Sequence, residues 1–136
     1  MATVTGKYLG DLKVEATHEA SGTTMFTDAP VDNGGEGRSF SPTDLCAMSL
    51  GMCAMTIVGL FAKNHGLDIE GATYTVNKIM TSKPPRRIAE IEVVFNMPAK
   101  GYTDKDKQSF ERATQTCPVR LSLHPETNQK ISFNWG

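Results

Sequence analysis

The first 41 residues show the alternating pattern of short β-strands, followed by a loop. Apolar and polar residues alternate over residues 12–17, which is the period of a strand with one buried face. Residues 23–27 fit its hairpin partner, and residues 4–9 predict a weaker third strand. Residues 29–41 hold Pro30 and three glycines without periodicity, so they predict a loop of the length that often carries function.

A long helix is predicted next. Ser41 fits its N-cap, Pro42 its first position, Asp44 its first turn and Gly66 its left-handed end. Residues 45–62 carry no charge and just reach the length of a membrane span. They are mostly Ala, Gly, Ser, Thr, Cys and Met, and no basic or aromatic belt flanks them. We therefore interpret the run as the buried central helix of a core, not as a membrane segment.

The second half of the chain predicts a hairpin, a helix and a last strand. Residues 71–82 and 86–97 are β-rich runs joined by a proline-containing turn. Thr103 fits the cap of a helix that runs to about residue 116, Pro118 interrupts or restarts it, and residues 131–135 predict a strand. The order predicts an α+β fold in one domain over residues 1–136: an N-terminal three-stranded antiparallel sheet, a long central buried helix, and a second antiparallel sheet with a further helix.

Composition indicates a small hydrophobic core and favours association with a second copy of the chain. The 136 residues match a common single-domain size, yet only 28 of them are Leu, Ile, Val or Phe. A subunit with so few strong hydrophobes gains from burying a face against another copy, which favours a homodimer.

Charge and motifs exclude several function classes. The net charge is −1 and no run of like charge reaches five residues, which argues against nucleic acid as a partner. The N-terminus has no basic segment followed by an apolar stretch, so we expect a cytoplasmic protein. No histidine pair has metal-ligand spacing and no phosphate-binding loop occurs, so we expect neither a metal nor a cofactor.

The three cysteines offer either packing or redox chemistry. None belongs to a CxxC motif, which argues against structural zinc or a disulfide scaffold. Cys46 and Cys53 are about 10.5 Å apart along one helix, too far for a disulfide, so a redox pair must include Cys117. If a helical turn starts at Pro118, the Cys117 sulfur lies at its N-terminus, where backbone donors favour a thiolate. Plain core packing also fits all three residues.

Together these motifs resemble the OsmC/Ohr family of thiol-dependent hydroperoxide reductases, and most closely its general OsmC-like branch. The resemblance rests on the sequence SPTDL at residues 41–45, Cys53 eleven residues after the proline, Gly66, and Cys117 followed by proline. It implies an intertwined homodimer with both active sites at the subunit interface. It also implies that Cys53 attacks the hydroperoxide, that Cys117 resolves the sulfenic acid as a disulfide, and that an external dithiol reduces that disulfide.

The resemblance assigns further roles. An apolar pocket for organic hydroperoxides gives a role to four side chains of the helix: Met48, Met52, Met55 and Phe61. The best-characterised members carry a carboxylate directly after the helix-opening proline, which orients an arginine toward the reactive thiol. Here that position is Thr43, with Asp44 next, and Arg38 or Arg120 is the candidate arginine.

One cysteine and one substitution lie outside the family pattern. Cys46 matches nothing in the family and is interpreted as core. Thr43 in place of the carboxylate motivates an alternative function: a dimeric small-molecule-binding or redox-sensing protein with little peroxidase turnover.

Overall fold

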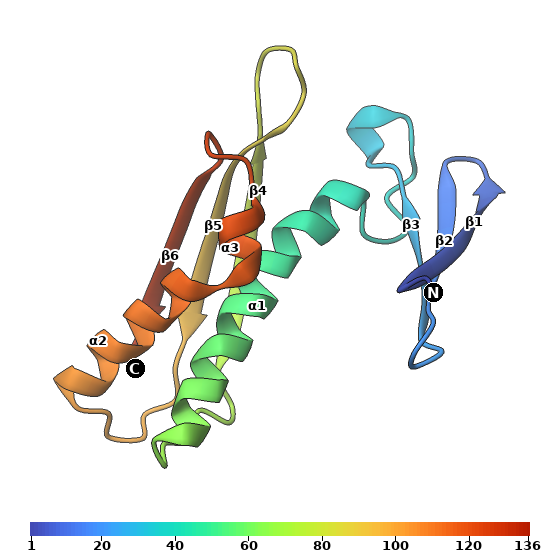
Figure 1. Cartoon of the computed structure of the whole chain (residues 1–136). Coiled ribbons are helices and arrows are strands. Elements are labelled where there is room, and N and C mark those ends of the chain that lie inside the picture. Colours follow the sequence, from blue (N-terminus) through green and yellow to red (C-terminus); the bar gives the residue numbers. More distant parts are fainter. The chain divides into compact units, whose positions relative to one another are not determined.

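The computed structural model describes residues 1–136 and has the predicted α+β class (Figure 1). The chain divides into two compact units, residues 1–46 and residues 47–136, each of which is described by itself. The assignment of the whole chain to one domain stays a prediction.

The N-terminal unit is a three-stranded antiparallel sheet, as predicted. Its strands are β1 (Val4–Gly10), β2 (Lys13–His18) and β3 (Thr24–Asp28), in the order β1-β2-β3. The register pairs Tyr8 with Val14 and Val14 with Thr27, so these side chains share one face.

That sheet has almost no apolar interior. Val14 is 44% exposed, although the alternating pattern predicted that it is buried, so this prediction is wrong for the single chain. The physical reason is that no helix of the N-terminal unit covers either face of the sheet. Exposed apolar side chains therefore gather along its strands: Val4, Tyr8, Leu9, Leu12, Val14, Met25 and Phe26.

Helix α1 (Pro42–Asn64) begins and ends where the sequence predicts. The Ser41 hydroxyl accepts a hydrogen bond from the Asp44 backbone N–H at 3.1 Å, and the Asp44 carboxylate accepts one from the Ser41 N–H at 2.9 Å. This reciprocal pair is a capping box. At the other end, Gly66 has a φ of 67°, and the Leu67 N–H donates to the Ala62 carbonyl at 2.8 Å, which closes the last turn.

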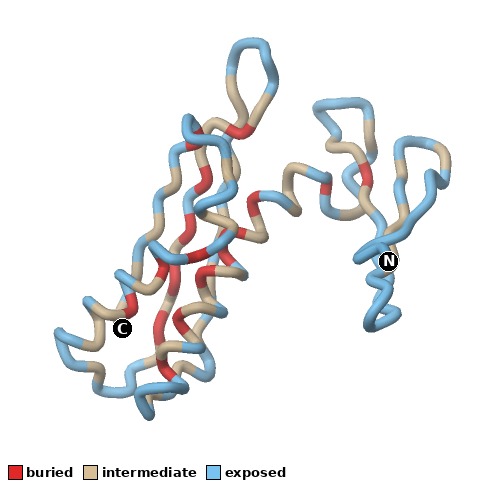
Figure 2. Tube along the Cα trace, viewed as in Figure 1, coloured by how far each residue is buried: buried red, intermediate tan, exposed pale blue.

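Only one side of α1 is buried (Figure 2). A Cβ atom on Gly51 would lie 2.9 Å from Val76 Cγ2, so a glycine is needed where the helix meets the sheet. Met52 and Leu60, on the other side, are 48% and 54% exposed, so burial on every side is wrong for the single chain. By length and composition α1 could also cross a membrane, and 33% of its most apolar window is buried within the chain. The buried positions are Ala47, Leu50, Gly51, Ala54, Val58 and Ala62.

The C-terminal unit contains the second sheet. Strands β4 (Thr73–Met80) and β5 (Ile88–Asn96) form the predicted antiparallel hairpin. Strand β6 (Asn128–Asn134) pairs with β5 in parallel, so the prediction of a fully antiparallel sheet is wrong. The cause is the long helical connection between β5 and β6, which returns the chain to the start of β5 before β6 begins.

That connection consists of two helices and a tight turn. Helix α2 (Asp104–Ala113) is capped by Thr103, as predicted, and Asp106 completes a second capping box. A 3₁₀ turn, η2 (Thr114–Thr116), follows, and helix α3 (Pro118–Ser122) then restarts at Pro118.

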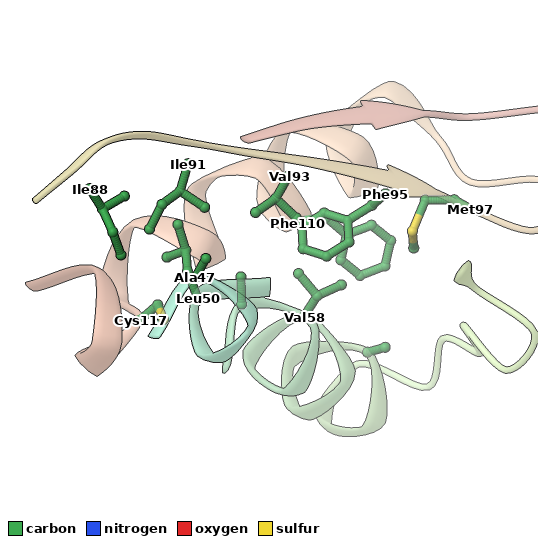
Figure 3. Packing of buried hydrophobic residues seen from close by; sticks show 12 residues of the cluster. Ala47, Leu50, Val58, Ile88, Ile91, Val93, Phe95, Met97, Phe110 and Cys117 are labelled. Atoms are coloured by element: carbon green, nitrogen blue, oxygen red, sulfur yellow. The ribbon is translucent and has the colours of Figure 1, made fainter. Parts of the chain in front are cut away.

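The core of the protein lies in the C-terminal unit (Figure 3). The inward residues of β5, namely Ile91, Val93 and Phe95, are fully buried. Phe110 from α2 and Cys117 are fully buried in the same cluster. Burying a Phe side chain contributes about 1.5–3 kcal/mol, so this cluster is the main source of stability within the chain.

Candidate active site

The structure brings Cys53 and Cys117 together. Cys53 lies midway along α1 and is half-buried, whereas Cys117 is fully buried. Both are free thiols, and Cys53 packs against the buried cluster that contains Cys117. Helix spacing excluded a disulfide between Cys46 and Cys53. The fold places Cys117 near Cys53, so Cys117 is the candidate redox partner of Cys53.

Cys117 occupies the N-terminus of α3, as predicted, with Pro118 as the first helical residue. The backbone N–H groups of Arg120 and Val119, at the start of α3, lower the pKa of Cys117 and so favour the thiolate. Burial has the larger effect and raises the pKa of Cys117 above its usual 9.0, and the neighbouring Cys53 side chain raises it further. The expectation that the helix start would favour a Cys117 thiolate is therefore corrected: at neutral pH Cys117 is a protonated thiol.

Arg38 has carboxylate partners inside the N-terminal unit. Asp28, fully buried at the end of β3, accepts hydrogen bonds through Oδ2 from the Arg38 backbone N–H at 3.1 Å and from Arg38 Nε at 3.0 Å. Arg38 Nη2 also lies 3.4 Å from Asp11 Oδ2. The Arg38 backbone N–H, followed by its side chain, holds the pKa of Asp28 below the usual 3.8. This pair fixes the loop between β3 and α1, and a catalytic role of Arg38 stays a prediction.

Sequence reasoning missed Asp28. The available signal was a carboxylate at the end of an apolar-polar alternation, ten residues before an arginine in a glycine-rich loop. A buried charge requires a partner, so an acidic residue that a strand pattern places inward predicts a nearby cation.

Asp44 has a structural role at the start of α1. Its carboxylate caps the helix through the Ser41 N–H, and the hydroxyls of Ser41 and Thr43 lie 3.2 Å apart. Its catalytic role stays a prediction.

Among the four apolar side chains assigned to a substrate pocket, Phe61 stands farthest from Cys53 along α1. Phe61 lies about 12 Å along the helix axis from Cys53, because eight residues separate them. It stacks on His65 with ring centroids 3.9 Å apart and meets Phe110 edge-on at 5.6 Å. Met55 packs against the core, Met52 is exposed, and Met48 is half-buried. Their role in substrate binding stays a prediction.

Arg120 lies beside a groove, where its role as the activating arginine stays a prediction, and Cys46 lies at the surface. The Arg120 side chain borders a groove of about 700 Å³ beside β6, together with Glu111 and Lys130, and neither Cys53 nor Cys117 lines this groove. Cys46 is exposed, so its interpretation as a core residue is wrong. No group of three or more His, Cys, Asp and Glu side chains has an arrangement that could hold a metal ion.

Comparison with known proteins decides the family. Residues 35–132 match the family model described as OsmC-like protein. The chain belongs to the OsmC-like family. A crystal structure from Psychrobacter arcticus, described as that of a candidate osmotic stress induced and detoxification response protein, is 41% identical, with a TM-score of 0.93, and the match covers 98% of this chain and 96% of that one. Among curated proteins no match was found.

More distant structures share the fold of this OsmC-like protein. An organic hydroperoxide resistance protein from Elizabethkingia anophelis is 18% identical with a TM-score of 0.75, over 100% of this chain and 98% of that one. An organic hydroperoxide resistance protein OsmC from Legionella pneumophila is 15% identical with a TM-score of 0.75, over 98% of each chain. The family is therefore the one predicted from the motifs around Cys53 and Cys117, and the α+β class is confirmed, whereas the intertwined dimer stays a prediction.

Proposed function

We propose that this OsmC-like protein is a thiol-dependent reductase of organic hydroperoxides that acts in oxidative-stress defence. The observation that carries the proposal is that Cys53 packs against the buried cluster that contains Cys117 and lies close enough to raise the pKa of that thiol. A half-buried thiol beside a fully buried second thiol is the arrangement that a two-cysteine peroxidase cycle requires.

The proposed cycle transfers two electrons to the peroxide. The Cys53 thiolate attacks the outer oxygen, an S–O bond forms, the O–O bond breaks, and the alkoxide leaves and takes up a proton as the alcohol. Cys117 then loses its proton and attacks the Cys53 sulfenic acid, which forms the disulfide and releases water. An external dithiol reduces the disulfide by thiol–disulfide exchange and is itself oxidised to a disulfide. By the resemblance to the family, Met48, Met52 and Met55 line an apolar pocket for the organic part of the hydroperoxide.

We also propose that the protein acts in the cytoplasm as an intertwined homodimer. The exposed apolar face of the N-terminal sheet, which includes Val14, supports the dimer, and so does the exposed side of α1 at Met52 and Leu60. Charge supports it too: residues 1–46 hold three basic and seven acidic residues, and residues 47–136 hold eleven and eight. Opposite net charges of this kind favour contact between the first unit of one copy and the second unit of another.

The test of the peroxidase is direct. Reduced protein is mixed with cumene hydroperoxide or tert-butyl hydroperoxide, and free thiols and peroxide are measured over time. We expect two thiols to be lost per peroxide in the wild type and in Cys46→Ser, the matched control. Cys53→Ser should lose at least 100-fold in rate, since removing an attacking nucleophile abolishes the step. Peroxide consumption by Cys53→Ser at the wild-type rate contradicts the proposal.

A second function is favoured by one observation. Arg38, the nearest candidate activator in sequence, is held by Asp28, and Thr43 stands where the best-characterised members have a carboxylate. A redox-sensing or small-molecule-binding dimer would form the disulfide once and turn over slowly. The steady-state rate of peroxide consumption with excess dithiothreitol separates the two functions, because a peroxidase sustains fast turnover after the first oxidation whereas a sensor turns over slowly.

A further inference from the structure

One polar side chain lies among the apolar residues that β6 directs toward the core. Gln129 pairs in register with Ile91, so its side chain shares the face of the sheet on which Ile91 is buried. The next two residues of β6 on that face are the apolar Ile131 and Phe133, which pack against the core. An amide at such a position is unfavourable unless its donors and acceptor find partners.

The amide of Gln129 has its partner on α3. Its Nε2 donates a hydrogen bond to the backbone carbonyl of Arg120 at 3.0 Å. A carbonyl oxygen only accepts, so this contact fixes which end of the amide faces α3. The other end, Oε1, is buried and has no hydrogen-bond partner within the chain. Because an unpaired buried acceptor lowers stability, the hydrogen bond to α3 is the feature that accounts for a glutamine here.

Helix α3 has few other attachments. Inside the helix the Leu121 N–H donates to the Cys117 carbonyl at 3.2 Å, and at its start the Cys117 N–H donates to the Thr114 carbonyl of η2 at 3.4 Å. Val119 packs against the core, but apolar packing is non-directional and does not fix the helix in one position. Gln129 is therefore the residue of the sheet that holds α3 by a directed contact.

We propose that Gln129 is a positioning residue, which holds α3 in place and so keeps Cys117 beside Cys53. Cys117 is the N-cap residue of α3, three residues before Arg120, and is fully buried in the same cluster as Ile91 (Figure 3). The inference rests on the proposed function, in which Cys117 loses its proton and attacks the Cys53 sulfenic acid, the S–S bond forms, the S–O bond breaks, and water leaves. Well-oriented groups react faster than loosely held ones, so loosening α3 slows this step and spares the first.

The first measurement separates the two steps of one turnover. Protein with Cys46→Ser, the parent of all variants, is reduced and mixed with one equivalent of cumene hydroperoxide, and dimedone traps the Cys53 sulfenic acid for mass spectrometry. Gln129→Met keeps the length of the side chain and removes the donor, so it should consume peroxide at the parent rate but lengthen the life of the sulfenic acid about tenfold or more. Gln115→Met, the same change at an exposed glutamine of the neighbouring groove, is the matched control and should leave both rates unchanged.

The second measurement uses no peroxide. The protein is equilibrated in mixtures of reduced and oxidised glutathione, and the fraction with a disulfide between Cys53 and Cys117 is measured. In Gln129→Met the equilibrium constant for forming this disulfide should fall about tenfold, which raises its reduction potential by about 30 mV. In Gln129→Glu the carboxyl donates to the Arg120 carbonyl only when it is protonated. Its potential should therefore match that of the parent at low pH and that of Gln129→Met at high pH.

Several outcomes overturn the inference. It fails if Gln129→Met leaves the potential unchanged, if that variant slows the first step as much as the second, or if Gln115→Met has the same effects. It also fails if the difference between Gln129→Glu and the parent does not depend on pH, or if the parent forms no disulfide between Cys53 and Cys117. If Gln129→Met does not fold, Gln129→Leu provides the same two measurements.

The two measurements also distinguish this inference from the proposed function. A parent that consumes no peroxide, but whose disulfide potential shifts in Gln129→Met, contradicts only the proposed function. Peroxide consumption by the parent together with an unshifted potential in Gln129→Met contradicts only the role of Gln129.

Discussion

The two units of the chain are stabilised in different ways. The C-terminal unit packs α1, α2 and the second sheet around buried Ile, Val, Leu and Phe side chains. The N-terminal unit buries Asp28 and Ser41, and its apolar side chains are largely exposed. A small sheet without a covered face is marginal by itself. The comparison teaches that the site cysteines lie in the unit that has its own hydrophobic core. The stability of the N-terminal sheet depends instead on an ion pair and on a partner that covers its apolar face.

The largest effect is expected in the core of the C-terminal unit. Phe95→Ala should lower the free energy of unfolding by about 3–5 kcal/mol, because it leaves a cavity beneath α1. Phe26→Ala, the matched change on the exposed N-terminal sheet, should cost under about 1 kcal/mol in a monomer. Urea denaturation followed by circular dichroism at low protein concentration measures both. Equal losses would mean that the two units are equally well packed.

A change on the apolar face of the N-terminal sheet tests what covers it. Val14→Lys places a charge beside Tyr8 and Thr27 and should weaken the dimer, raising its dissociation constant at least tenfold. Thr17→Lys, on the opposite face of the same strand, is the control and should leave the dimer intact. Sedimentation at several concentrations measures the shift. A monomeric wild type would contradict the proposed dimer.

The ion pair of the N-terminal unit predicts a dependence on acid. Because the folded-state pKa of Asp28 lies below 3.8, its stabilisation is present above that value and is lost as the pH falls through the lower, folded value. Asp28→Asn should therefore lower stability at pH 7 and flatten its fall between pH 4 and pH 2. Glu36→Gln, whose carboxylate lies 3.6 Å from Arg38 and is exposed, should keep the wild-type slope. Denaturation midpoints measured between pH 4 and pH 2 distinguish the Asp28 variant from the Glu36 variant.

The smallest effects are expected at the two capping boxes. Ser41→Ala should cost up to about 2 kcal/mol, since Ser41 is buried, and Thr103→Ala, at an exposed cap, about 0.5–1 kcal/mol. Thermal unfolding of the two variants measures the loss of stability caused by each substitution. A larger loss for Thr103→Ala would show that burial does not strengthen the cap.

Local chemistry accounts for most of the correct predictions. Ser41 with Pro42, Thr103 and Gly66 mark helix ends because their side chains or backbone angles satisfy specific backbone groups. The parallel pairing of β6 had no such local signal, since it depends on where a long crossover returns the chain. Asp28 was missed for a similar reason: its partner Arg38 lies across a loop, and strand alternation does not report ion pairs.

The sequence by itself determined the elements, the family and the identity of the thiols. Helix α1, the cysteine at Cys53 and the Cys117-Pro118 helix start can be read from local patterns and spacing. Only the tertiary structure decided which side of α1 is buried, that Cys53 meets Cys117, and that burial keeps Cys117 protonated. The physical reason is that ionisation and contact depend on solvent exclusion by residues distant in the chain, whereas caps and helices depend on neighbours a few residues away.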